Sequence, residues 1–142
     1  MFNLATLLEE TTRRTPDRLA VIFDETRLTY AQINGAANQV ANAMVELGIR
    51  PGDPVALSCP NLPYFPIVYY GILKAGAVVV PLNVLLKGRE IGEHLKDSKA
   101  KAFVCFQGTA ELPMGEFGAE GFDAAPDCHS MVVITADPTA AS

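Results

Sequence analysis

Hydrophobic residues near the start of the chain follow first a helical and then a strand-like spacing. Apolar positions three and four residues apart predict a helix over residues 4–14, with Asn3 as its N-cap and Pro16 beyond its end. The compact apolar run LAVIF (19–23) predicts a strand, and LTY (28–30) returns after a polar turn. We therefore expect a small β-hairpin after the first helix.

A second, longer helix is predicted to begin after Thr29. Thr29 and Gln32 have the spacing of a capping box, in which a hydroxyl and a side-chain amide each pair with a free backbone N–H. Gly48 should end the helix in a left-handed conformation. Five apolar positions share one helical face: Ile33, Ala37, Val40, Met44 and Leu47. Four small residues suggest close packing on a neighbour: Gly35, Ala36, Ala37 and Ala41.

The third helix begins near a group of prolines and ends near Lys74. Asn61 is its predicted N-cap, and Pro63 suits its first turn. Pro66 must either start the regular helix or remove a hydrogen bond and bend it. Gly76 then closes the helix, and we expect it to have a positive φ.

Four further apolar runs predict the strands of one sheet. The run AVVVP shows no alternation of apolar and polar residues, so we expect helices to cover both faces of this strand. A helix over residues 88–96, with Ile91 and Leu95 directed inward, precedes the third run. The four runs are 55–58 (VALS), 77–81 (AVVVP), 102–106 (AFVCF) and 131–135 (MVVIT).

The alternation of strands and helices predicts an α/β fold, with a layered, mostly parallel sheet, flanking helices and right-handed crossovers. Residues 107–130 are rich in Gly, Ala, Pro and acids, so we expect loop that includes at most one short helix. Residues 136–142 are typical of a frayed end or a linker. The chain is thus predicted to divide into an α/β body, 1–106, and an acidic segment, 107–142, with a last strand near 131–135.

The distribution of charge argues against one class of function. The net charge is −5, and all 11 Lys and Arg residues lie at or before Lys101. Residues 102–142 carry six acids and no base, which leaves the first 101 residues at +1 (11 minus 10). A nucleic-acid binder needs clustered Lys and Arg to displace counterions, so nucleic acid is not an expected partner.

The cysteines and the N-terminal sequence indicate a reduced, cytoplasmic location. The number of cysteines is odd and no CxxC pair occurs, and the start of the chain lacks the basic segment of a signal peptide. Residues 66–86 approach the length of a membrane span, but Lys74 lies at their middle, and Gly76 and Pro81 interrupt them. We therefore predict a buried helix followed by a buried strand, and no transmembrane span.

Few residues have a pattern that indicates chemistry. Neither the GxGxxG nor the GxxxxGK[ST] phosphate-binding loop is present, and no GxSxG sequence occurs. His94 lies in a charged helical segment and is predicted to face solvent. Cys128 and His129 are adjacent in sequence, whereas catalytic Cys/His pairs usually meet from separate segments. Two isolated histidines and three scattered cysteines do not predict a metal site.

Other candidates are better explained by structure than by function. Cys105 is interpreted as inert core packing, and Glu90 and Glu93 as part of a solvated helix face. Core packing is favoured over an apolar ligand tunnel for four aromatic residues: Tyr64, Phe65, Tyr69 and Tyr70. No catalytic, cofactor-binding or metal-binding residue is therefore predicted in this chain.

Several motifs follow one another across about residues 3–106, among them LTYAQIN (28–34), LGIRPGD (47–53) and YYGILKAGAVVVPLN (69–83). In this order they resemble the N-terminal segment of the adenylate-forming acyl-CoA synthetase superfamily. The ending PLN and the pattern E…L.DS.AK that follows it are more similar to fatty-acyl-CoA ligases than to peptide-synthetase adenylation domains. Pro54, where the family tends to have a basic residue, and Pro66 depart from the pattern. The matching stretches are PDRLAVIF (16–23), LTYAQIN (28–34), LGIRPGD (47–53), NLPYF (61–65), YYGILKAGAVVVPLN (69–83) and REIGEHLKDSKAKAFV (89–104).

The resemblance implies a parent enzyme that activates a fatty acid with ATP and Mg²⁺ and transfers the acyl group to coenzyme A. In the family, the phosphate loop, the adenine-contacting segment, the ribose-binding Asp and the catalytic Lys come later, so we expect this chain to be an inactive N-terminal fragment. Asn83, at the end of a strand, is the residue expected nearest a ligand, although a turn-forming role is favoured. Two alternatives stay open: a standalone binding or interaction module, and a fragment of an aryl- or amino-acid-activating relative.

The expected partners are the remainder of the parent chain and, in the parent, a carboxylic acid substrate. A sheet that lacks its later segments would leave an apolar patch and an unpaired edge. We therefore expect a homodimer, with residues 64–86 or 131–135 near the contact. A peripheral contact with a membrane surface is also left open.

Overall fold

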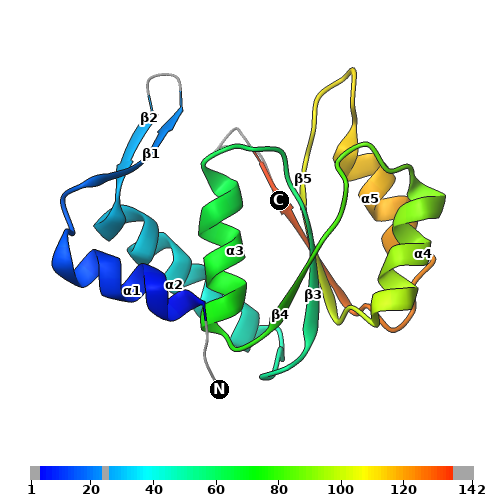
Figure 1. Cartoon of the computed structure of the whole chain (residues 1–142). Helices are drawn as coiled ribbons and strands as arrows, with labels where there is room; N and C mark the ends of the chain where they lie inside the picture. Colours follow the sequence, from blue (N-terminus) through cyan, green and yellow to red (C-terminus); the bar gives the residue numbers. More distant parts are fainter. Residues whose placement is uncertain (1–3, 24–25, 136–142) are drawn as a thin grey trace. The chain divides into compact units, whose positions relative to one another are not determined.

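The computed structural model describes residues 4–23 and 26–135. The predicted cap at Asn3 and the predicted frayed end, 136–142, lie outside the described residues. The chain divides into two compact units (Figure 1). One comprises Met1–Gly52 and Asn61–Val78, and the other comprises Asp53–Pro60 and Val79–Ser142.

The first unit combines three helices with the predicted hairpin. β1 and β2 pair antiparallel, and the Thr29–Gln32 capping box is confirmed: each residue accepts a hydrogen bond from the other's backbone N–H, at 2.9 and 3.2 Å. The elements are α1 (Ala5–Arg14), β1 (Leu19–Phe23), β2 (Thr26–Thr29), α2 (Tyr30–Glu46) and α3 (Tyr64–Lys74).

The core of the first unit lies where α1 and α2 meet the hairpin and α3. Leu8, Ile33 and Ala37 are buried together, and half-buried apolar residues pack around them: Ala20, Val21, Leu28, Tyr30, Ile67 and Tyr70. Ile33, Ala37 and Met44 of the predicted face of α2 are buried, so the helical periodicity identified the inner face correctly.

The close approach of α2 to α3 depends on a glycine that the sequence did not single out. Gly35 is exposed, and a Cβ there would meet nothing within 4 Å, so its proposed role in close packing is wrong. A Cβ on Gly71 of α3 would instead lie 2.4 Å from the Val40 side chain. The two helices can pack closely because Gly71 of α3 leaves room for the Val40 side chain of α2.

The start of α3 also differs from the prediction. Pro63, not Asn61, occupies the N-cap position, and no side chain caps the helix. Pro66 is the third residue of the helix, where a backbone N–H would have no intrahelical partner in any case, so it neither starts nor bends the helix. Gly76 ends the segment with φ +82°, as predicted, and Gly48 has φ +87°.

The second unit contains a four-stranded sheet with strand order β4-β3-β5-β6. β3 pairs parallel with β5, and β5 pairs parallel with β6, which confirms the predicted α/β class. α5 packs against β5 and β6, and α4 packs against α5, as Figure 1 shows. The elements are β3 (Pro54–Ser58), β4 (Val78–Pro81), α4 (Gly88–Ser98), β5 (Ala102–Phe106), α5 (Met114–Asp123) and β6 (Ser130–Ile134).

The valine strand β4 is not buried on both faces, which corrects the prediction. β4 lies at one edge of the sheet, and Val78 is 51% exposed. β5 lies between two strands, and all five of its residues are buried. The fully covered strand is therefore AFVCF and not AVVVP.

Residues 107–130 include one helix, as expected, and this helix, α5, has ten residues. Gly121 of α5 allows contact with α4, since a Cβ there would lie 2.5 Å from Ile91 Cγ2. β6 then returns to pair with β5. The predicted division of the chain into an α/β body, 1–106, and an acidic segment, 107–142, stays a prediction. Within residues 4–23 and 26–135, no helix has the length and apolarity needed to cross a membrane.

Candidate functional site

The carboxyl ends of the parallel strands are the first place to look for a site, because ligands of α/β sheets bind beyond them. Ser58 at the end of β3 is aligned with Cys105 on β5, and both residues are buried. Burial raises the pKa of the Cys59 thiol to about 11. Burial, with a smaller electrostatic contribution from Cys59, raises the pKa of Cys105 to about 12. Both thiols are therefore protonated and unreactive at neutral pH, as predicted for Cys105.

The backbone beyond β5 folds into a turn that satisfies its own hydrogen bonds. The N–H of Gln107 donates to the Ile134 carbonyl at 2.9 Å, and the N–H of Leu112 donates to Thr109 Oγ1 at 3.1 Å. Gly108 has φ +82°, and a Cβ there would lie 2.2 Å from the Leu112 carbonyl oxygen. This turn is fixed by internal contacts and presents no converging set of catalytic groups.

The residues singled out on and before α4 have structural roles. Asn83 Oδ1 accepts a hydrogen bond from the Leu85 N–H at 2.8 Å, which confirms the turn-forming interpretation. His94 is exposed, as predicted. Glu90 accepts a hydrogen bond from the Lys87 N–H at 3.1 Å, and Glu93 lies 3.4 Å from Arg89 Nε. These two carboxylates belong to a solvated helix face, as predicted.

Cys128 and His129 do not form a catalytic pair. Cys128 is buried, and burial raises the pKa of its thiol, while the Sγ lies 3.8 Å from the Ser130 carbonyl oxygen. His129 Nδ1 lies 3.3 Å from Ser130 Oγ. No group of three or more His, Cys, Asp and Glu side chains that could hold a metal ion occurs in the described part of the chain.

The aromatic cluster of α3 contributes to packing and also to an apolar groove. Phe65 and Tyr69 have ring centroids 5.8 Å apart, and Tyr69 and Tyr70 stand edge to face at 5.9 Å. Tyr70 packs against the core of the first unit, which agrees with the interpretation as core packing. Tyr70 and Pro66 also border a groove of about 280 Å³ that α1, β1 and α2 complete.

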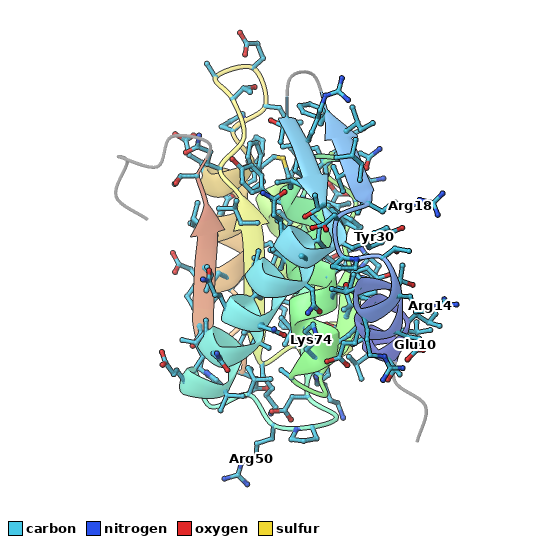
Figure 2. All side chains as sticks on the ribbon, turned by 90° about the vertical axis from the view of Figure 1, so that its left-hand side faces the viewer. Glu10, Arg14, Arg18, Tyr30, Arg50 and Lys74 are labelled. Carbon is cyan, nitrogen blue, oxygen red and sulfur yellow. The ribbon has the colours of Figure 1, made fainter. Side chains whose placement is uncertain are left out.

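A polar pocket of the first unit is lined by Lys74, which the sequence showed only as an interruption of an apolar stretch. A pocket of about 460 Å³ lies among α1, α2 and α3. The Lys74 side chain is 6% exposed, and its Nζ lies 3.1 Å from Glu9 Oε2. Figure 2 shows Lys74 between α1 and α2, whereas Glu10 and Arg14 lie on the outer side of α1. In the sequence, the only indication that Lys74 could have a special role was that it is the one charged residue in 66–86.

The comparison with protein families decides what kind of chain this is. The AMP-binding enzyme family model matches residues 8–141. The chain belongs to the AMP-binding enzyme family. Together with the fold, this confirms the predicted resemblance to the N-terminal segment of adenylate-forming acyl-CoA synthetases.

Three proteins that are similar to this chain have names that indicate different substrates or products. The chain is 39% identical over 106 residues to the long-chain-fatty-acid–CoA ligase FadD13 of Mycobacterium tuberculosis, covering 73% of this chain and 21% of that protein. It is 37% identical over 95 residues to one of the mycosubtilin synthase proteins of Bacillus subtilis, covering 67% of this chain and 4% of that protein. A crystal structure of the anthranilate CoA ligase AuaEII with anthranoyl-AMP matches with a TM-score of 0.82 and 30% identity, covering 94% of this chain and 25% of that one.

The AMP-binding enzyme family implies ATP as a substrate, and the absence of cofactor-binding residues from this chain stays a prediction. The chain spans only about a fifth of FadD13 and a quarter of the AuaEII chain. It has neither the GxGxxG nor the GxxxxGK[ST] phosphate-binding motif. We therefore assign no step of the chemistry to these residues.

Proposed function

We propose that this chain is the N-terminal α/β part of a ligase that activates a fatty acid with ATP to an acyl-adenylate and transfers the acyl group to coenzyme A. The observation that carries this proposal is the 39% identity to a long-chain-fatty-acid–CoA ligase over 106 residues. The remainder of the parent chain would hold ATP, Mg²⁺, coenzyme A and the acid. The proposed location of the parent is the cytoplasm.

In this proposal the chain contributes architecture and no catalytic, cofactor-binding or metal-binding residue. The buried strands β3 and β5 form the centre of a sheet, and Asn83 shapes the turn that follows β4. The two thiols nearest the carboxyl edge, Cys59 and Cys105, are protonated at neutral pH because burial raises their pKa values. Catalysis of acyl transfer depends on positioned charges and donors, and these would come from residues outside this chain.

A second candidate function is activation of an aryl acid. The observation that favours it is the match to an anthranilate CoA ligase structure, which has a TM-score of 0.82. Fatty acid stays the first choice because the match to the FadD13 sequence extends over 106 residues at 39% identity. Activation of an amino acid by the same adenylate-forming chemistry is the remaining alternative.

Pyrophosphate exchange tests this proposal with a panel of fatty, aryl and amino acids. The 142-residue chain is expected to show no exchange with any acid, because no phosphate loop is present. The product of a longer reading frame that contains these residues is expected to exchange with fatty acids first. Robust exchange by the 142-residue chain would contradict the assigned division of labour, and exchange by the longer protein with aryl acids alone would favour the second candidate.

We also propose that the 142-residue chain forms a homodimer through its uncovered apolar surface. β4 is an edge strand, and two large apolar side chains close to it are exposed, Val78 at 51% and Leu85 at 65%. Edges and patches of this kind pair with a second copy most simply about a two-fold axis. The acidic C-terminal segment should limit further growth at low salt. Analytical ultracentrifugation over a concentration series is expected to show a dimer, and a single monomeric species at high micromolar concentration would contradict this.

A further inference from the structure

The polar pocket around Lys74 has the form of a binding site. Its lining is contributed by α1, α2 and α3 of the first unit. Lys74 is the buried member of this lining, and its Nζ has almost no surface open to solvent, whereas the polar residues around it are exposed. The polar lining residues are Thr6, Glu9, Asn38, Asn42 and Lys74.

The ammonium group of Lys74 is short of acceptors. It carries three N–H donors, and Glu9 Oε2 at 3.1 Å is within ion-pair distance. Even so, Lys74 Nζ is buried and makes no hydrogen bond of normal geometry within residues 4–23 and 26–135. A buried ammonium group that is paired with one carboxylate still has N–H donors to satisfy, and an anionic oxygen that enters the pocket can accept hydrogen bonds from them.

The Glu9 contact alone does not account for the pocket. The Glu9 side chain is 57% exposed, and an ion pair with a solvated partner contributes little to stability. Two asparagines of α2, Asn38 and Asn42, also line the pocket, and their amides offer both donors and acceptors. A simple structural ion pair needs neither the asparagines nor a pocket of about 460 Å³.

We propose that this pocket binds a small organic anion. Its phosphate or carboxylate group accepts hydrogen bonds from Lys74 and Thr6, and its neighbouring hydroxyl groups reach Glu9, Asn38 and Asn42. The site is separate from the acid-activating chemistry proposed above and does not depend on it. Its volume accommodates a molecule larger than a bare phosphate ion.

Titration of the 142-residue chain, followed by amide NMR shifts, tests the proposal with three probes. Glycerol 3-phosphate and glycerate supply a phosphate or a carboxylate beside hydroxyl groups, and glycerol is the neutral control. The expected result is saturable shifts at the residues of α1, α2 and α3 that line the pocket, with either anion or both and without effect from glycerol. Whichever anion binds more tightly identifies the preferred acidic group.

Three variants separate binding from structure. Lys74→Met replaces lysine by an unbranched, uncharged side chain that is one atom shorter, so the affinity for the anion should fall at least about tenfold. Glu9→Gln removes a competing negative charge, so the affinity should rise about threefold or more. Lys96→Met, at an exposed cation of α4, should leave the affinity unchanged. Circular dichroism confirms that each variant is folded.

The contrary results are equally specific. Absence of saturable shifts with both anions would overturn the proposal, because the folded wild-type chain already presents Lys74. Unchanged or weaker binding in a folded Glu9→Gln variant would also overturn it, since that result identifies Glu9 and Lys74 as a purely structural pair. Equal losses in the Lys74→Met and Lys96→Met variants would indicate nonspecific attraction of anions to positive charge.

Discussion

The strands β4 and β5 look alike in sequence and differ in position. VVVP and AFVCF are both apolar and show no alternation with polar residues. β5 is paired on both sides and buried at every residue, whereas β4 is an edge strand whose first valine is 51% exposed. An apolar run therefore indicates a strand that tolerates burial, and the order of strands in the sheet decides whether burial occurs.

Matched valine substitutions give the largest expected contrast between the two strands. Val104 of β5 is 2% exposed, so Val104→Ala should cost about 2–3 kcal/mol through lost burial and an added cavity. Val78→Ala on β4 should cost less than about 1 kcal/mol, because half of that side chain already contacts solvent. Urea denaturation measures both values. Equal losses would mean that β4 is covered in solution, for example by a second copy.

The turn that leads into β4 is expected to depend on a glycine more than the strand depends on its first valine. Gly76 has φ +82°, and a Cβ there would lie 3.2 Å from Pro51 Cβ, so Gly76→Val should cost about 1–2 kcal/mol or more. Gly48→Val is the control, because Gly48 has φ +87° and open space around its Cβ position. The Gly48 variant should show only the backbone strain. An unchanged urea midpoint for Gly76→Val would show that the left-handed conformation is not required.

Alkaline pH should also destabilise the chain, through a buried thiol of β5. Burial raises the pKa of Cys105 to about 12 in the folded state, so the thiol ionises more readily when the chain unfolds. The contribution of the protonated Cys105 thiol to the free energy of unfolding is fully present below the ordinary thiol pKa. It is lost as the pH rises through about 9 toward 12, and the free energy of unfolding falls by about 1.4 kcal/mol per pH unit.

Urea midpoints between pH 8 and pH 10.5 measure this effect. A folded Cys105→Ala variant is expected to show a shallower decline than the wild type, and Cys59 should account for part of what remains, because burial raises its pKa to about 11. β4 carries no titratable side chain and contributes nothing to the slope. Identical pH profiles for the wild type and the variant would mean that the Cys105 thiol is not desolvated in the fold.

Features of the candidate site could be predicted only where a single segment creates them. Asn83 bonds to a backbone N–H two residues away, so its turn-forming role was accessible from the sequence. Lys74 was visible as the only charge in residues 66–86, but its pocket requires residues of α1 and α2 that lie 32 or more positions away. The pattern of apolar residues in one helix does not predict which residues of three helices will line a common pocket.

The sequence by itself determined the local features of this protein, and the tertiary structure decided which surfaces meet. The Thr29–Gln32 capping box and the positive φ at Gly48 and Gly76 follow from hydrogen bonds and steric limits within a few residues. Two other features depend on segments distant in sequence. One is that Gly71, and not Gly35, lies at the close contact between α2 and α3, and the other is the place of β4 at the sheet edge. Local sterics act on every conformation of the chain, whereas burial is defined only once those segments have packed.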